Sequence, residues 1–172
     1  MISTERIDNH LAKDKFPVTP AIRFLRKQKV EFTCHPYPYQ ERGGTKVSSR
    51  ELGVPENQVV KTLVALDEKK QPFLILMHGD CEVSFKELAR VRGVKTVSSC
   101  EPKVANRLTG YQVGGISPFG TRKALQVYME ESILELERLF INGGKRGFLV
   151  SLSPADLETI LDCTLVSVKT CK

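Results

Sequence analysis

The chain has 172 residues, of which 41% are hydrophobic, and a formal net charge of +6 at pH 7. This length and apolar content favour one compact domain over a disordered chain. No apolar stretch approaches the ~20 residues that span a bilayer, and the polar opening residues differ from a signal peptide. We therefore expect a soluble, cytoplasmic protein with no membrane partner.

The charge and the cysteines restrict the function less strongly. Small groups of Lys and Arg permit a polyanionic partner without requiring one, because such groups are often only solvated surface. Five cysteines occur without any C-x-x-C pair, which fits neither a disulfide framework nor a zinc site. We expect five reduced thiols, with Cys34 and Cys163 serving in packing.

The residue patterns predict a flexible tail over residues 1–16 and a single domain over residues 17–172. Helix signals include Thr19 before Pro20, Ser153 before Pro154, and two capping boxes that begin at Ser48 and Ser84. Gly53 is expected to end the helix that begins at Ser48. The expected helices cover approximately residues 20–29, 48–52, 84–92, 102–109, 131–136 and 154–161. The expected strands cover approximately residues 30–37, 59–67, 71–78, 94–99, 125–129, 138–142, 148–152 and 164–169. About seven strands and six helices in irregular order predict a mixed α+β fold, not a doubly wound sheet.

The segment GGISPFG, residues 114–120, is the most informative for chemistry. Three glycines and a proline in seven residues fix an irregular backbone whose N–H groups could cradle an anion or a carbonyl oxygen. An ordinary structural turn explains the same composition. Ser117 lacks the G-x-S-x-G setting of a serine nucleophile.

Lys61 is a single charge within the apolar run VVKTLVALD. It either faces solvent or points into a cavity, where it would contact a phosphate or carbonyl. The basic turn GGKRG could similarly contact phosphate through Lys145 and Arg146, or simply be a solvated hairpin end. The three histidines have no partner at metal-ligand spacing, so we expect neither a metal nor a cofactor.

Four ordered segments carry a resemblance to a known family: TPAIRFLRKQKVEF, VVKTLV, TGYQVGGISPFG and INGGKRG. They resemble the YbaK family of aminoacyl-tRNA deacylases, which is related to the editing domain of bacterial prolyl-tRNA synthetases. The resemblance covers residue 17 to the end. It implies a barrel-like mixed sheet surrounded by helices, with a small pocket beside the lysine and the glycine-rich loop.

The resemblance also implies the roles of individual residues. Lys61 and Gly114 are the expected catalytic residues, with Lys61 holding the terminal phosphate or ribose and the amides of Gly114 and Gly115 contacting the oxyanion. The expected substrate-binding residues are Tyr37, Gly115, Ser117, Pro118, Lys145 and Arg146. Several relatives have an acidic residue where this chain has Leu149, which leaves the partner of the substrate's amino group unassigned.

In this family, the thiol of a misattached cysteine is proposed to attack its own ester carbonyl and leave as a thiolactone. We therefore expect an enzyme that removes cysteine from proline transfer RNA, and possibly from cysteine transfer RNA, in a transient complex with prolyl-tRNA synthetase. One alternative is a deacylase for other small amino acids, such as alanine on proline transfer RNA. Another is a non-catalytic module that binds transfer RNA or a synthetase.

Overall fold

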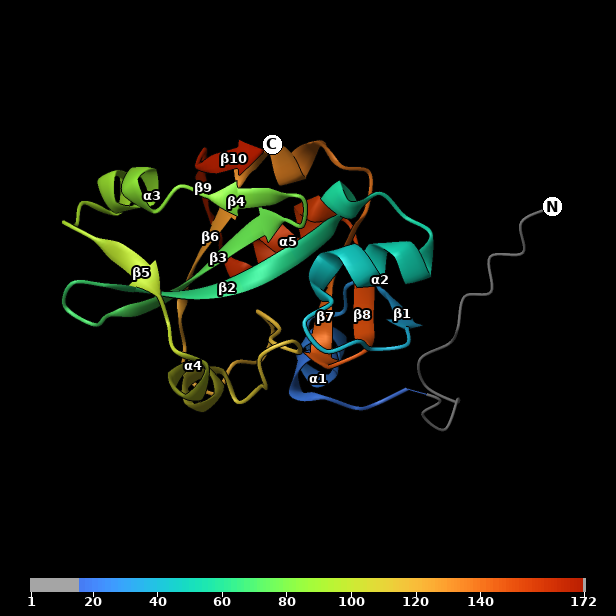
Figure 1. Ribbon diagram of the computed structural model, residues 1–172. Helices are drawn as coiled ribbons and strands as arrows, with labels where there is room; N and C mark the ends of the chain where they lie inside the picture. Colours follow the sequence, from blue (N-terminus) through green and yellow to red (C-terminus); the bar gives the residue numbers. More distant parts are fainter. Residues whose placement is uncertain (1–15, 172) are drawn as a thin grey trace.

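The protein is described here by a computed structural model of residues 16–171 (Figure 1). Eight strands form one mixed sheet: β1 (Thr33–Pro36), β2 (Val59–Asp67), β3 (Pro72–His78), β5 (Val97–Ser99), β6 (Gln126–Glu130), β7 (Leu139–Lys145), β8 (Phe148–Leu152) and β9 (Thr164–Val166). A second sheet pairs β4 (Cys81–Val83) with β10 (Lys169–Cys171). The helices are α1 (Pro20–Gln28), α2 (Gly44–Leu52), α3 (Phe85–Arg92), α4 (Pro102–Thr109) and α5 (Pro154–Leu161), with 3₁₀ turns η1 (Glu56–Gln58) and η2 (Glu131–Glu135).

This architecture confirms the predicted mixed α+β class and corrects the element count. The described residues form ten strands and five α-helices rather than about seven and six. The predicted final strand over residues 164–169 is two strands, β9 and β10. The predicted short helix at residues 131–136 is a 3₁₀ turn.

The β2–β3 hairpin lies at the centre of the larger sheet, whose strand order is β1-β8-β7-β2-β3-β6-β9. The two hairpin strands pair antiparallel from Val60 opposite His78 to Leu66 opposite Pro72. Their outer neighbours are parallel, because β7 pairs with β2 and β6 pairs with β3. β5 also pairs with β2, at the end of that strand nearest the hairpin turn.

Side-chain caps begin three of the helices at the predicted residues. The Thr19 hydroxyl accepts a hydrogen bond from the Ile22 amide at 3.1 Å, immediately before α1. Ser84 caps α3 and Ser153 caps α5 in the same way. Each cap satisfies a backbone donor that has no partner within the helix.

Helix α2 begins earlier than the Ser48 capping box predicts. Its first residue is Gly44, and the Ser48 hydroxyl is buried and donates to the Thr45 carbonyl at 3.2 Å. Thr45 fixes the start of the helix by donating to the Glu56 carboxylate at 2.9 Å. This contact joins residues 11 positions apart, which a local capping pattern does not detect. Gly53 ends the helix with a φ of 66°, as predicted.

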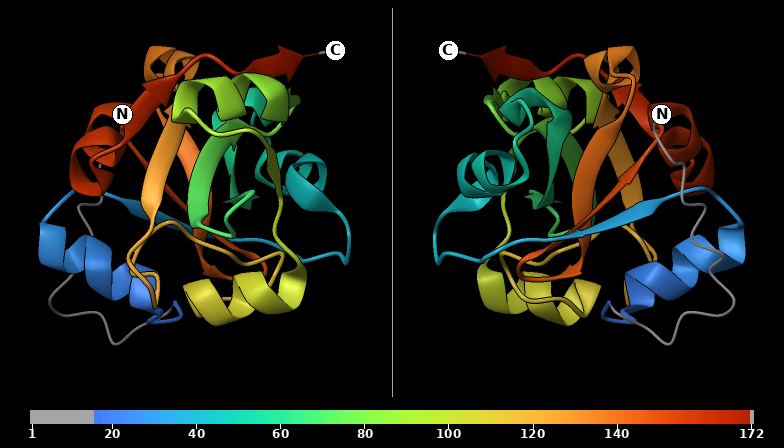
Figure 2. Two further views of the ribbon diagram at one scale, coloured as in Figure 1. Left: turned by 90° about the vertical axis from the view of Figure 1, so that its left-hand side faces the viewer. Right: turned by 90° about the vertical axis from the view of Figure 1, so that its right-hand side faces the viewer.

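The main hydrophobic core lies between the sheet and helices α1, α4 and α5. Figure 2 shows α1 and α4 at the same end of the molecule, opposite α3. A second cluster lies under α3 and includes Phe73 and Leu88. The main core includes Leu25, Leu74, Leu76, Phe119, Met129 and Leu157.

Cys81 and Cys171 form a disulfide between β4 and β10, which corrects the prediction of five reduced thiols. The two cysteines are 90 residues apart and meet only because their strands pair antiparallel. Cys34, Cys100 and Cys163 are free, and Cys34 and Cys163 pack against the main core. Burial is the largest of the effects that raise the pKa of the Cys163 thiol to about 12, which suits a packing role.

The predicted flexible tail lies outside the described residues, apart from Phe16. That side chain stacks on Phe148, with ring centroids 6.3 Å apart. Among the helices of residues 16–171, none is long and apolar enough to cross a membrane.

The disulfide gives a first testable prediction. Closing a loop of this length restricts the unfolded chain, so Cys171→Ser should lower the free energy of unfolding by about 2–4 kcal/mol. Urea unfolding of the oxidised protein and of the variant measures this difference. Dithiothreitol should bring the wild type to the stability of the variant and leave the variant unchanged. Equal stability of all four samples, the two proteins with and without dithiothreitol, would contradict the pairing.

Candidate functional site

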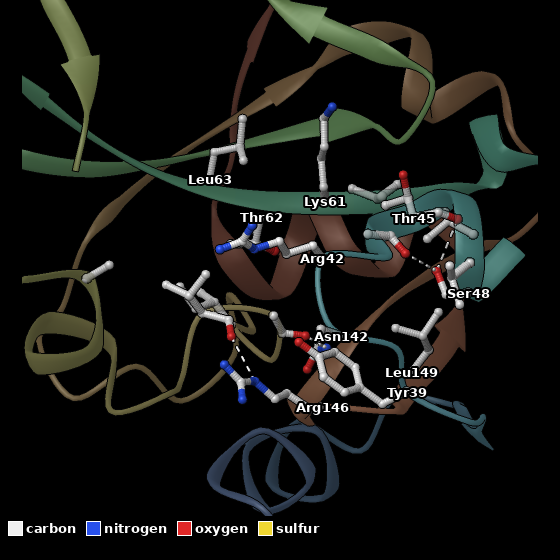
Figure 3. Close-up of a pocket in the computed structure, with 18 of the residues that line it drawn as sticks. Tyr39, Arg42, Thr45, Ser48, Lys61, Thr62, Leu63, Asn142, Arg146 and Leu149 are labelled. Atoms are coloured by element: carbon white, nitrogen blue, oxygen red, sulfur yellow. Dashed lines mark hydrogen bonds between the residues drawn. The ribbon is translucent and has the colours of Figure 1, made fainter. Parts of the chain in front are cut away.

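A cavity of about 670 Å³ opens beside the centre of β2. Its walls come from the segment that follows β1, the start of α2, the β5–α4 connection, the loop after α4, and the β7–β8 hairpin. A volume of this size accommodates a ligand as large as an aminoacylated nucleoside. Figure 3 shows most of the polar side chains on these walls.

Lys61 lies on the wall of this cavity, but its ammonium group extends toward β4 (Figure 3). The Nζ atom is 3.5 Å from the Gly79 carbonyl oxygen and 3.7 Å from Glu82 Oε1. The side chain is 21% exposed, so the charge is partly buried and remains accessible. Both distances exceed the 2.7–2.9 Å typical of charge-assisted hydrogen bonds, so an incoming anion can replace these partners.

Thr62 is a pocket residue that the sequence patterns did not single out. Its Oγ1 is the one buried side-chain oxygen or nitrogen without a hydrogen-bond partner in residues 16–171. Buried polar groups are nearly always paired, and an exception on a pocket wall suits a group that a ligand completes. The only sequence signal is its place beside Lys61, where strand alternation turns it to the opposite face.

The glycine-rich loop packs against the β7–β8 hairpin, and this contact explains its glycines. Gly114 has a φ of +92°, and a Cβ there would lie 2.8 Å from the Tyr39 hydroxyl. A Cβ on Gly115 would lie 2.8 Å from the Arg146 amide nitrogen. Both positions therefore need glycine, but for close packing as much as for ligand contact.

The predicted oxyanion contact is only partly compatible with this loop. Gly114 lines the cavity, and its carbonyl accepts from the Asn142 side-chain amide at 3.3 Å. The Gly115 amide already donates to the Gln112 carbonyl at 2.8 Å, and the Gly115 residue is absent from the cavity wall. Its N–H is thus used within the turn.

Ser117 and Pro118 lie in the interior rather than on the cavity wall. The Ser117 side chain is fully buried, and its hydroxyl accepts from the Phe119 amide at 3.3 Å. This arrangement stabilises the loop, and neither residue lines the cavity. Contact with substrate, predicted for both residues, has no support in this geometry.

The remaining predicted residues divide between the wall and the surface. Arg146 lines the cavity, where its Nε donates to the Val113 carbonyl at 3.0 Å. Lys145 is exposed and lies outside the wall. Tyr37 lines the cavity and is half-buried, which raises the pKa of its hydroxyl. Its amide donates to the Gly147 carbonyl at 2.9 Å.

Leu149 makes one part of the cavity apolar. It is buried in a small cluster with Val59 and Phe140, and Tyr37 packs against this cluster. An ammonium group placed there would lose hydration without gaining a counter-ion. The amino group of a substrate therefore needs a partner elsewhere.

Two of the three histidines are structural, and His10 lies outside the described part of the chain. His78 bonds through one ring nitrogen to the Asn57 carbonyl and through the other to Ser132. His35 bonds to Ser151 at 2.7 Å, and burial lowers its pKa. Neither histidine lines the cavity, and residues 16–171 contain no cluster of ligands able to hold a metal ion.

Comparison with known proteins identifies the family. The family model described as "Aminoacyl-tRNA editing domain" matches residues 44–160. The chain belongs to this family. It is therefore an aminoacyl-tRNA deacylase by class, as the sequence predicted.

Individual relatives are similar to this chain over different shares of their own length. EbsC of Enterococcus faecalis, provisionally named as a Cys-tRNA(Pro)/Cys-tRNA(Cys) deacylase, is 31% identical over 85% of this chain and 88% of its own length. A proline–tRNA ligase of Thermodesulfovibrio yellowstonii is 31% identical over 64% of this chain but only 18% of that enzyme. The solved structure of a provisionally assigned trans-editing enzyme for prolyl-tRNA synthetase has a TM-score of 0.77 and 22% identity, covering 90% of this chain and 99% of that one. This last match supports the fold.

The unpaired Thr62 hydroxyl gives a second prediction. Thr62→Val keeps the side-chain shape and removes an unsatisfied buried group, so it should raise the free energy of unfolding by up to about 1–2 kcal/mol. Thr109→Val is the matched control, because Thr109 Oγ1 donates to the Ala105 carbonyl and accepts from the Tyr111 amide. The control should lower stability in the same urea titration. A loss of stability in both variants would show that Thr62 has a partner in solution.

Proposed function

We propose that the protein removes cysteine from mischarged proline transfer RNA, with the substrate's own thiol as the nucleophile. The observation that carries this proposal is a large pocket without an activated protein nucleophile. Within residues 16–171, the wall has no histidine, and its one thiol is Cys100. Burial, and then the nearby Glu101 carboxylate, raise the pKa of that thiol and disfavour its reactive thiolate form.

The wall also has the hydroxyl groups of Thr45, Ser48, Thr62 and Ser99, but within residues 16–171 no histidine lies on it to act as their base. Thr45 has only the Glu56 carboxylate beside it, in a hydrogen bond that joins α2 to η1, and Ser48 is buried within α2. Histidine is the usual base that activates a serine hydroxyl, and within residues 16–171 the Thr62 hydroxyl has no hydrogen-bond partner. If the substrate brings its own thiol, the protein needs no nucleophile.

The proposed reaction needs only the substrate's own thiol and ester, and then water. The cysteine thiol loses its proton, and its sulfur forms a bond to the ester carbonyl carbon. The ester C–O bond then breaks, and the ribose oxygen leaves with a proton as the free end of the transfer RNA. The cyclic thiolactone takes up water to become cysteine. Holding the sulfur and the carbonyl carbon at attack distance can lower the activation free energy by at most on the order of 7–11 kcal/mol.

Lys61 and Thr62 are the polar groups proposed to position the ester. The loosely held Lys61 ammonium would exchange the Gly79 and Glu82 oxygens for a phosphate or ribose oxygen of the acceptor end. Thr62 would hydrogen-bond the aminoacyl group on the opposite face of β2. Gly114 remains the proposed loop contact for the developing oxyanion.

Glu41 is the proposed partner of the substrate's amino group. It is the one carboxylate on the cavity wall within the described residues, and its segment lies between Tyr39 and α2. The apolar Leu149 cannot take that role. An exposed carboxylate offers an ammonium group only modest affinity, so this contact would orient the substrate rather than dominate its binding.

Selectivity for proline transfer RNA is proposed to come from a transient complex with prolyl-tRNA synthetase. The similarity to segments of proline–tRNA ligases supports an origin in that editing system. The charge of +6 is modest for a protein that selects a whole transfer RNA by itself.

The decisive experiment compares cysteine and alanine on proline transfer RNA, with and without added prolyl-tRNA synthetase. Release of cysteine alone is expected, because alanine has no thiol to attack the ester. Equal release of both would overturn the thiol mechanism and indicate a broader deacylase that uses water. Binding without release would indicate a non-catalytic module.

Lys61→Ala gives the third prediction. Loss of a charged hydrogen bond to the substrate should lower kcat/KM for cysteine release by about 10–150-fold. Lys86→Ala removes the same charge from an exposed position on α3 and should leave the rate unchanged. Lys61→Ala should lose little thermal stability, because its ion-pair partner Glu82 is 77% exposed. Full activity of Lys61→Ala would exclude the proposed contact.

A further inference from the structure

We infer that Tyr39, supported by Arg146, is a stacking platform for the unpaired terminal adenine of the acceptor end. The inference rests on the proposed function, because it places the nucleoside that carries the aminoacyl ester. It adds a base-binding subsite at the cavity mouth. Figure 3 shows Tyr39 and Arg146 on the same part of the cavity wall.

Tyr39 is unusual among the aromatic residues of the described chain. It is 36% exposed and is the one aromatic among the large exposed side chains of residues 16–171. It also lines the cavity, together with Val113, which is 40% exposed. Two exposed apolar side chains at a pocket mouth provide a surface that a flat, apolar ligand face can cover.

The ring is held in place from several directions although it is exposed. The Arg146 guanidinium carbon is 5.4 Å from the Tyr39 ring centroid. Arg146 is fixed in turn by its hydrogen bond to the Val113 carbonyl. The backbone at Gly114 and Gly147 approaches so closely that a Cβ would lie 2.8 Å from the Tyr39 hydroxyl and 3.3 Å from its Cβ, respectively. A ring ordered in advance loses little conformational freedom when a ligand stacks on it.

The size and charge of the cavity indicate which ligand stacks. The volume of about 670 Å³ is typical of sites for ligands much larger than one amino acid. Single-stranded nucleic acids bind where aromatic rings and Arg guanidinium groups stack on bases beside positive charge. Tyr39, Arg146 and Arg42 all line the cavity and provide these features. An unpaired nucleobase joined to the ester fits better than a second apolar side chain.

The test uses two variants and two RNA hairpins that end in the acceptor sequence. One hairpin has the terminal adenine, and the other has an abasic ribose at that position. Tyr39→Leu removes the aromatic face, whereas Tyr39→Phe keeps it and removes only the hydroxyl. Binding of the uncharged hairpins is measured by fluorescence anisotropy, and cysteine release from the charged hairpins is measured as kcat and KM.

Tyr39→Leu should weaken binding of the adenine hairpin about 5–100-fold, mainly through KM in the release assay. Tyr39→Phe should bind like the wild type. On the abasic hairpin, wild type and Tyr39→Leu should be equally weak. Equal losses on both hairpins, or no loss on either, would overturn the platform. The anisotropy measurement tests the platform even if no cysteine is released. Absence of cysteine release would count against the proposed function alone.

Discussion

Strand β2 places the polar groups of the site, because it pairs with three other strands and can hardly shift along them. Val60 and Val64 anchor one face of the strand in the main core, which fixes the register. Alternation then sends Thr62 to the same face as these valines and Lys61 to the opposite face. A shift of one residue would exchange the two and bury the charge. The positions of the cation and the unpaired hydroxyl are therefore a consequence of core packing.

The second constraint is the contact between the glycine-rich loop and the β7–β8 hairpin. Gly114 and Gly115 allow the two backbones to approach, while Asn142 and Arg146 bond to loop carbonyls. The sequence alone left a carbonyl cradle and a structural turn as alternatives. The engaged amide of Gly115 favours a turn whose main role is to position neighbouring side chains, among them Tyr39.

Local signals in the sequence predicted most of the fold, because they depend on contacts a few residues apart. The Ser84 and Ser153 caps and the two strands of the β2–β3 hairpin are of this kind, and the family resemblance pointed to Lys61 and Gly114, which both line the cavity. The failures involve contacts between distant segments. The Cys81–Cys171 disulfide joins residues 90 positions apart. The Thr62 hydroxyl is the one buried side-chain oxygen or nitrogen of residues 16–171 without a hydrogen-bond partner. Only the three-dimensional structure reveals this.

The proposed mechanism also explains how a roomy pocket can serve a small amino acid. Hydrophobic pockets discriminate poorly between side chains that differ by one small group, so close fit alone would reject alanine only weakly. A reaction that depends on the substrate's thiol needs no such fit, because an ester without a thiol does not react in this way even when it binds. The cavity can then be shaped around what all its substrates share, the terminal nucleoside. On this view, amino-acid selectivity comes from substrate chemistry, whereas affinity comes from Lys61 and the aromatic wall at Tyr39.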